Sequence, residues 1–137
     1  MRYSIFSAGA ALLTTALAVT VSYDAGYDDR GRSLNAVACS NGKNGLITKG
    51  FTTQGSLPSF PRIGGAFPIA GWNDPNCGTC YSLTYEGQTV NILAIDHADG
   101  GFNIAESVMN TLTRGQAVFL GSIQVDYKRV DNSLCGL

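Results

Sequence analysis

Four cysteines, distributed over most of a 137-residue chain, constrain its fold more than any other feature. They stand at Cys39, Cys77, Cys80 and Cys135. An even number of cysteines indicates a disulfide framework in an oxidising compartment, and a metal or redox site in a reducing one. The compartment in which the chain folds therefore decides whether the cysteines form disulfides or a metal or redox site.

The first eighteen residues have the parts of a secretory signal. Arg2 supplies a positive start, residues 5–13 are mostly apolar, and Ala16-Leu17-Ala18 has the small-x-small form of a signal peptidase site. The apolar stretch is too short for a bilayer, which needs about 20 apolar residues. We predict a signal peptide at residues 1–18, a mature domain at residues 19–137 and an extracellular location without a membrane span.

Secretion favours two disulfides over the other uses of cysteine. Three pairings are possible, and those that close long loops would each stabilise the fold by about 4 kcal/mol, whereas a Cys77–Cys80 bond would constrain little. The segment Cys77-Gly78-Thr79-Cys80 has thioredoxin-like spacing, but the alternating residues 81–85 predict a strand where that motif needs a helix. A zinc site is disfavoured because His97 is the only histidine. We predict no metal or other cofactor.

Charged residues are few and mixed in sign. Ten acidic and nine basic residues are scattered singly or in pairs, and the formal net charge is −1. No basic block faces a phosphate backbone or an anionic lipid surface, so nucleic acid is not an expected partner. A hydrophobic content of 45% with 14% charged residues excludes a disordered chain. These values indicate one folded domain.

Short alternating runs separated by glycine, asparagine and proline predict a β-rich domain. The predicted strands are residues 19–23, 34–38, 81–85, 89–95, 116–120 and 123–130. One helix is predicted at Ile104–Leu112, with Asn103 as N-cap and Glu106 completing a capping box. Residues 57–71, rich in proline and glycine, predict a long ordered loop with a helical turn near residues 66–70. This mixture favours a small barrel.

Short motifs follow one another along the predicted mature domain. They are Val21-Ser22-Tyr23-Asp24, Cys39-Ser40-Asn41-Gly42, Gly64-Gly65, Ala70-Gly71-Trp72-Asn73, Cys77-Gly78-Thr79-Cys80, Ala94-Ile95-Asp96-His97, Gly101-Phe102-Asn103 and Asn132-Ser133-Leu134-Cys135-Gly136-Leu137. In this order, and with this cysteine spacing, the chain closely resembles the cerato-platanin family of small secreted fungal proteins.

The resemblance implies a mainly β domain, namely a six-stranded double-psi β-barrel like that of expansins, with one or two short helices. It implies disulfides Cys39–Cys77 and Cys80–Cys135, and a groove for chitin and other N-acetylglucosamine oligomers. Family members also loosen cellulosic material without hydrolysing it, self-assemble at interfaces and act on plants as elicitors or phytotoxins. The expected protein is a non-enzymatic monomer of the fungal cell wall and extracellular space, with a plant receptor as a further partner.

Asp96 is the first candidate functional residue, because it ends the apolar run at residues 90–95. A carboxylate there is expected at the barrel rim, partly desolvated and suited to proton chemistry. The alternative is that it only caps the following turn. The resemblance favours the groove, where the family's matching aspartate is tied to wall loosening. An endoglycanase with Asp96 as general acid is the alternative function. It would need a second carboxylate about 5 to 9.5 Å away, for which Asp24, Asp74 and Asp99 are available.

The other predicted glycan-binding residues are Asn103, Trp72, Asp74, Tyr81 and Phe102. The amide of Asn103 suits sugar hydroxyls and N-acetyl groups, although the same side chain is the proposed helix cap. Trp72 would stack on a pyranose ring if it were exposed, but a lone tryptophan beside a disulfide is expected to fill core volume. Tyr81 replaces the tryptophan that the family commonly has after the second cysteine of the pair.

Overall fold

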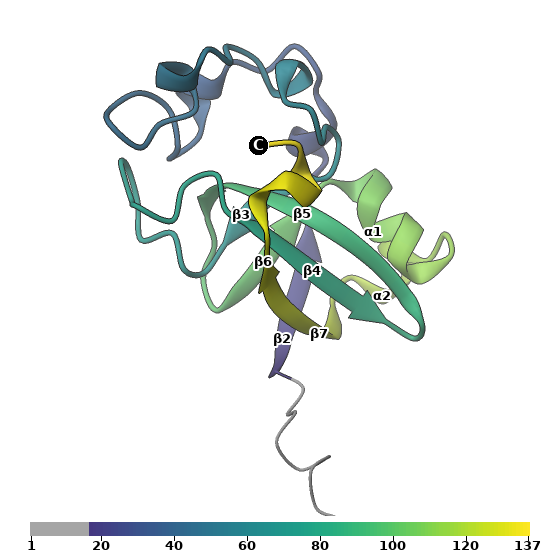
Figure 1. Ribbon diagram of the computed structural model, residues 1–137. Helices are drawn as coiled ribbons and strands as arrows, with labels where there is room; N and C mark the ends of the chain where they lie inside the picture. Colours follow the sequence, from purple (N-terminus) through teal and green to yellow (C-terminus); the bar gives the residue numbers. More distant parts are fainter. Residues whose placement is uncertain (1–16) are drawn as a thin grey trace, which may run out of the picture.

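The structure is a computed structural model that describes residues 17–137 (Figure 1). The predicted signal peptide lies outside these residues, except for Leu17 and Ala18, which begin the first described strand. Within residues 17–137, no helix has the length and apolar character needed to cross a membrane.

Six strands close into a barrel (Figure 1). They are β2 (Leu17–Tyr23), β3 (Ile63–Ala66), β4 (Cys80–Tyr85), β5 (Gln88–His97), β6 (Gly101–Ile104) and β7 (Ile123–Val130). Around the barrel they follow the order β2-β6-β3-β5-β4-β7. The β2–β6 and β3–β5 pairs are parallel, and the remaining pairs are antiparallel. The predicted six-stranded barrel is confirmed.

Alternation of apolar and polar side chains explains strand β7. In β7, Ile123 and Val125 are buried, whereas Gln124 between them and Asp126 after them are exposed. Successive side chains of a strand point to opposite faces, so this pattern places one face in the barrel core. The predictions for residues 19–23, 81–85, 89–95 and 123–130 are confirmed, because each lies within an observed strand.

Two strands of the barrel were missed, and glycine is the reason. Strand β3 is Ile63-Gly64-Gly65-Ala66, inside the segment predicted as a long loop. A Cβ at Gly64 would stand 2.4 Å from the carbonyl oxygen of Asn103, and one at Gly65 would stand 2.6 Å from that of His97. The backbones therefore approach closely here, as only glycine permits. In place of the predicted helical turn, Ile69 closes a single turn on Ala66.

Two α-helices lie on one side of the barrel, α1 (Glu106–Thr113) and α2 (Ala117–Leu120). The helix predicted at Ile104–Leu112 starts too early, because residues 101–104 form β6 and pair with both β2 and β3. Asn103 is not its N-cap. Instead, the Asp28 carboxylate accepts hydrogen bonds from the backbone N–H groups of Glu106 (2.8 Å) and Ser107 (3.3 Å). A carboxylate at this end also complements the helix dipole.

Two of the predicted strands are helical instead. Residues 34–36 form a 3-10 helix, η3 (Leu34–Ala36), because the side chain of Ser33 caps the backbone N–H of Asn35. Residues 116–120 contain α2, whose first N–H, from Ala117, is satisfied by the side chain of Asn110. Four other 3-10 helices complete the described chain: η2 (Ala25–Asp28), η4 (Ile47–Lys49), η5 (Gln54–Ser56) and η6 (Asn132–Cys135).

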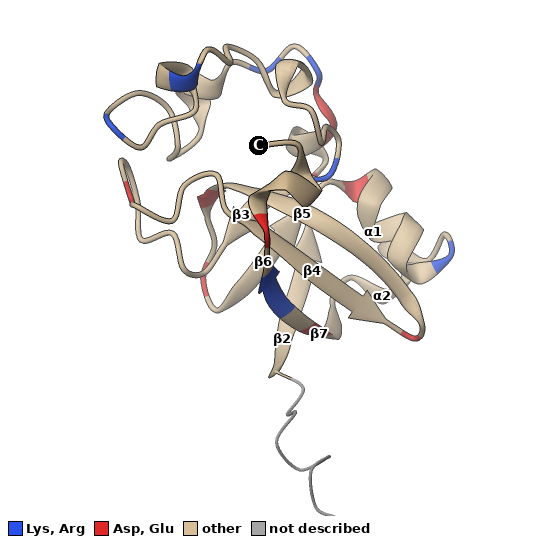
Figure 2. Cartoon of the chain, in the orientation of Figure 1, with Lys and Arg blue, Asp and Glu red and all other residues tan. Residues whose placement is uncertain are grey.

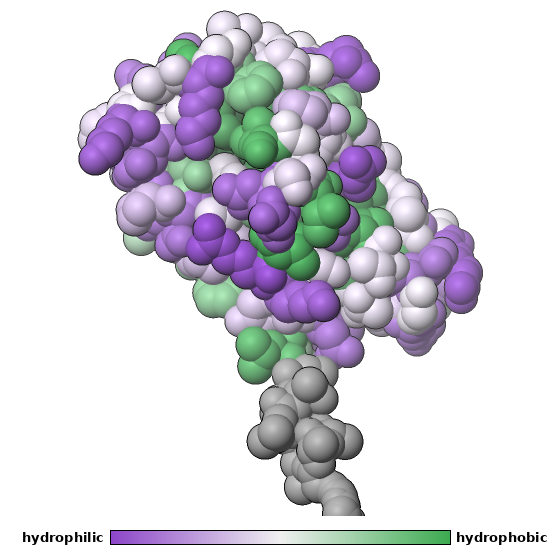
Figure 3. Space-filling model, viewed as in Figure 1, coloured by the Kyte–Doolittle hydropathy of each residue, from purple (hydrophilic) through white to green (hydrophobic). Residues whose placement is uncertain are grey.

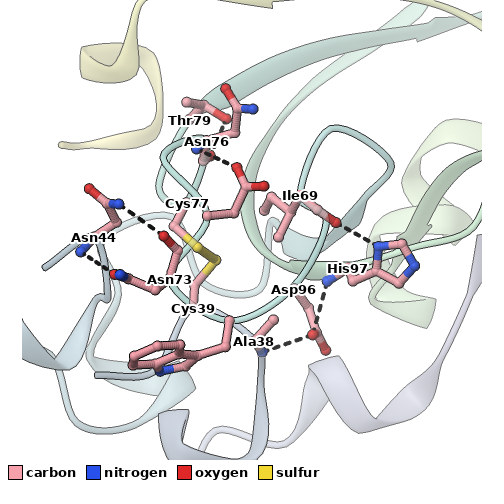
Figure 4. The surroundings of a disulfide bond; sticks show 12 residues. Ala38, Cys39, Asn44, Ile69, Asn73, Asn76, Cys77, Thr79, Asp96 and His97 are labelled. Carbon is pink, nitrogen blue, oxygen red and sulfur yellow. Dashed lines mark hydrogen bonds between the residues drawn. A yellow bond between two sulfur atoms is a disulfide. The ribbon is translucent and has the colours of Figure 1, made fainter. Parts of the chain in front are cut away.

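Residues 25–62 form a layer of loops and 3-10 helices above one end of the barrel (Figure 1). We call this segment the loop layer. The Cys39–Cys77 disulfide joins it to the segment before β4 (Figure 4), and the Cys80–Cys135 disulfide joins β4 to η6. The pairing implied by the family resemblance is confirmed. Inside the loop layer, buried Gln54 donates hydrogen bonds to two backbone carbonyls.

Charged residues stay dispersed in the folded chain. Figure 2 shows Lys and Arg, as well as Asp and Glu, singly or in short stretches spread over the chain. On the face drawn in Figure 3, hydrophilic and hydrophobic residues are interspersed. Neither view gathers one sign of charge into a stripe that would track a polyanion.

Candidate glycan-binding groove

A groove of about 340 Å³ lies beside β2 and β6. It is lined by Thr20, Ser22, His97, Ala98, Asp99, Phe102 and Asn103. Two hydroxyls, an amide, a carboxylate and an imidazole thus face one space. This combination of donors and acceptors matches a ligand with many hydroxyl groups.

Strand register places Asp96 and Asn103 in one row. Ser22 pairs with Asn103, Asn103 pairs with Gly65, and Gly65 pairs with Asp96. Residues paired in this way share a face of the sheet. Asp96 and Asn103 therefore lie on the same face of the sheet. Strand β3 runs between them, and its residue at this position is Gly65, which has no side chain.

The connection after β5 divides this row. A Cβ on Gly65 would stand 2.6 Å from the carbonyl oxygen of His97 and 3.2 Å from the Cβ of Ala98, so the chain passes close over Gly65. Ser22 and Asn103 open into the groove on one side of it. Asp96 is not among the residues that line the groove.

Asp96 is half-buried, and both of its carboxylate oxygens accept hydrogen bonds from the protein. Oδ1 accepts from the backbone N–H groups of Ala38 and His97, each at 2.9 Å (Figure 4). Oδ2 accepts from the hydroxyl of Tyr27, also at 2.9 Å. Burial, followed by the nearby charge of Asp96, raises the pKa of Tyr27 above its ordinary value, so the hydroxyl remains a donor. Asp96 thereby joins β5 to two points of the loop layer, Tyr27 in η2 and Ala38.

Asn103 lines the groove, and its side chain is held by a hydrogen bond. Its side-chain oxygen accepts a hydrogen bond from the Ser22 hydroxyl at 3.0 Å. This contact fixes the amide and leaves its N–H₂ end as a donor for a ligand. The residue is half-buried and lines the groove.

His97 forms one wall of the groove. Its Nδ1 contacts the backbone carbonyl of Ile69, and its Nε2 is 2.8 Å from Asp99 Oδ1. Both partners are acceptors, so both ring nitrogens can donate only in the imidazolium form. The Ile69 carbonyl, and then Asp99, raise the pKa of His97. Sequence reasoning missed this bridge because Ile69 and His97 are far apart in the chain.

Trp72 is exposed, contrary to the expectation that it fills core volume. It exposes 63% of its surface, and its indole N–H donates to Asn41 Oδ1 at 2.7 Å. In the same turn, Asp74 accepts hydrogen bonds from the backbone N–H groups of Ala70 and Asn76. These donors, that of Ala70 first, hold the pKa of the Asp74 carboxyl below its usual value. Asp74 thus fixes the turn that carries Trp72.

Two predicted glycan-binding aromatics lie in the core. Tyr81 and Phe102 expose only 4% and 2% of their surfaces, and their ring centroids are 5.3 Å apart. Phe102 also lines the groove, but neither buried ring exposes a face on which a sugar could stack. Within residues 17–137, no group of three or more His, Cys, Asp or Glu side chains is arranged to hold a metal ion.

Comparison with known proteins places this geometry in context. A family model described as cerato-platanin matches residues 19–137. The heat-stable 19 kDa antigen of Coccidioides immitis (strain RS) is 49% identical over 145 residues, which span 100% of this chain and 99% of that protein. The crystal structure of cerato-platanin 2 from M. perniciosa has a TM-score of 0.84 and 47% identity, covering 88% of this chain and 100% of that one. The solution structure of the fungal elicitor cerato-platanin has a TM-score of 0.77 and 39% identity, covering 85% and 96%.

Proposed function

Because this chain belongs to the cerato-platanin family, we propose that it is a secreted fungal protein that binds chitin-type N-acetylglucosamine oligomers in the groove without hydrolysing them. The solved elicitor of the same fold and 39% identity supports a role as an elicitor or phytotoxin on plants, through a receptor of the host. Retention in the fungal cell wall and loosening of cellulosic material are the further activities we propose for the secreted protein.

The observation that carries the proposal is the set of polar groups in the groove. Thr20, Ser22, Asn103 and Asp99 present hydroxyl, amide and carboxylate groups within one space. Sugar hydroxyls both donate and accept, and an N-acetyl group adds one donor and one acceptor. Each hydrogen bond replaces one made to water, so the net gain is about 1 kcal/mol per bond. Affinity is therefore expected between micromolar and millimolar, about −4 to −8 kcal/mol.

The surroundings of Asp96 support binding without hydrolysis. A glycosidase needs a general acid that delivers a proton to the leaving oxygen, and usually a second carboxylate across the scissile bond. Both oxygens of Asp96 already accept hydrogen bonds from protein groups, and its side chain is outside the groove lining. The carboxylate that does line the groove, Asp99, contacts His97.

Titration with N-acetylglucosamine monomer, dimer and tetramer, followed by amide NMR and calorimetry, tests the proposal. We expect tetramer to bind more tightly than monomer and to shift the amide signals of Ser22 and Asn103. Asn103→Ala should weaken tetramer binding, whereas Asn35→Ala, at an exposed position outside the groove, should not. Equal affinity of the two variants, or release of reducing sugar by the purified protein, would overturn the proposal.

A further inference from the structure

We propose that Trp72 forms a second carbohydrate site, separate from the groove, which stacks on the apolar ring face of a β-linked glucan or chitin chain. The proposal depends on the proposed function for the class of ligand. It differs from the proposed function because it assigns binding of the polymer to the surface around Trp72, through aromatic stacking rather than hydrogen bonds in the groove. Trp72 is not among the groove-lining residues.

Exposure is the first observation in favour of this site. Trp72 is the only tryptophan in the chain, and it exposes 63% of its surface. Tryptophan is highly buried on average, so an indole left in water costs free energy that a ligand can recover. The two core aromatics, Tyr81 and Phe102, show that this fold buries rings where packing is their role.

The indole is also held in place before any ligand arrives. Its N–H is engaged by Asn41 Oδ1 at 2.7 Å, which fixes one edge of the ring. A Cβ at Gly42 would stand 3.0 Å from Trp72 Cζ2, so this edge lies close to the backbone. A ring already fixed in one orientation loses little conformational freedom when a ligand stacks on it.

The turn beneath the ring is tied to the loop layer at several points. Asn73 Oδ1 accepts from the backbone N–H of Asn44, and the side chain of Asn44 donates to the Asn73 carbonyl, both at 2.9 Å (Figure 4). The Cys39–Cys77 disulfide joins the same two segments covalently. Trp72 therefore sits on a rigid support, as a binding residue requires.

Amide groups around the indole suit the edge of a sugar ring. Asn41 is exposed, and because its Oδ1 accepts from the indole, the N–H₂ end of the same amide is a donor next to the ring. A β-linked glucosyl or N-acetylglucosaminyl unit carries its hydroxyls around the ring edge and presents C–H groups on its faces. An apolar plane with a polar border matches both parts of that unit.

The test measures binding of purified Trp72→Ala and Trp72→Phe to insoluble β-chitin and regenerated cellulose. We expect at least a tenfold loss for Trp72→Ala and partial retention for Trp72→Phe, which keeps an aromatic plane. The matched control is Phe119→Ala, since Phe119 is another exposed aromatic, at 85%, on α2. Equal losses in Trp72→Ala and Phe119→Ala would mean nonspecific adsorption and would overturn the proposal.

Fluorescence gives a second measurement that needs no variant. With one tryptophan in the protein, emission reports on this site alone. We expect soluble chitin hexamer to shift the emission to shorter wavelength and to protect Trp72 from iodide quenching. A β-mannan oligomer, whose axial hydroxyls roughen the ring face, should have a smaller effect. Unchanged emission and quenching with chitin hexamer would overturn stacking.

The two proposals fail in different ways. If tetramer shifts Ser22 and Asn103 but Trp72→Ala binds polymer like the wild type, the groove stands and the Trp72 site falls. If polymer binding depends on Trp72 while no groove amide responds to tetramer, the reverse holds. Circular dichroism of each variant confirms that it is folded.

Discussion

Replacing Tyr27 by phenylalanine removes a single oxygen atom, and with it the hydrogen bond to Asp96 Oδ2 at 2.9 Å. Tyr27 exposes only 4% of its surface, so water does not readily replace the lost contact. Hydrogen bonds to charged groups contribute about 1.5–3 kcal/mol to stability. Because Asp96 is half-buried, we expect the lower part of that range, about 1.5–2 kcal/mol.

A double-mutant cycle separates this bond from other effects of the substitutions. Asp96→Asn keeps an oxygen to accept from the backbone N–H groups of Ala38 and His97, but it places an N–H₂ group opposite Tyr27. The variant should fold, with a loss of about 1–2 kcal/mol. In the double variant the losses should fall short of additivity by about 1 kcal/mol, because the second change finds the bond to a charged carboxylate already lost.

Urea unfolding followed by far-UV circular dichroism supplies the four free energies of the cycle. Tyr23→Phe is the control, since the Tyr23 hydroxyl makes no hydrogen bond within residues 17–137, and it should change stability by less than about 0.5 kcal/mol. Additive losses for Tyr27→Phe and Asp96→Asn, within about 0.5 kcal/mol, would refute the bond as a stabilising contact.

The same tyrosine predicts a pH dependence with a definite sign. The folded-state pKa of Tyr27 is raised above its ordinary value of 10.0, first by burial and then by Asp96. Its contribution to stability is complete below pH 10.0 and decreases above it, where the unfolded chain releases the proton and the folded chain does not. The free energy of unfolding should therefore fall more steeply above this pH in the wild type than in Tyr27→Phe.

Three further predictions concern backbone packing, the histidine and the disulfides. Gly101→Ala should cost about 3 kcal/mol, because its Cβ would stand 2.0 Å from the Thr20 carbonyl oxygen, whereas Gly71→Ala, with no atom within 4 Å, should be neutral or stabilising in the same thermal denaturation series. Because the pKa of His97 is raised in the folded state, its contribution to the free energy of unfolding is complete below the ordinary pKa of 6.5 and is lost as pH rises through the folded-state pKa. In urea unfolding between about pH 5 and 9, the His97→Gln variant should lack this decrease in stability. Reduction of both disulfides, which close segments of 38 and 55 residues, should remove about 4 kcal/mol for each; an unfolding midpoint that reductant leaves unchanged would contradict this.

The parts of the fold that were predictable from sequence are those whose side chains alternate. In β7, Ile123, Val125 and Tyr127 alternate with polar residues, a pattern typical of a strand with one buried face. Strands β3 and β6 have four residues each and contain glycine, so their pairing depends on neighbours distant in sequence. Residues 34–38 resemble a strand locally, but a serine cap and the lack of a neighbouring strand make the first three of them helical. Tertiary contacts therefore decided these cases against local pattern.

The sequence predicted that Asp96 lies at the end of an apolar strand. It did not predict which groups donate hydrogen bonds to its carboxylate. Tyr27 is 69 residues away from it and reaches it only because η2 follows β2 at the adjacent end of the barrel. For Trp72 the sequence predicted the wrong environment. A lone tryptophan beside a disulfide-bonded cysteine indicated burial. Exposure arises because the turn that bears it is held by Asp74 and by the Cys39–Cys77 disulfide, so the indole is not needed as packing. A fold that anchors its loops by hydrogen bonds and disulfides can leave an aromatic ring in solvent, where a ligand can reach it.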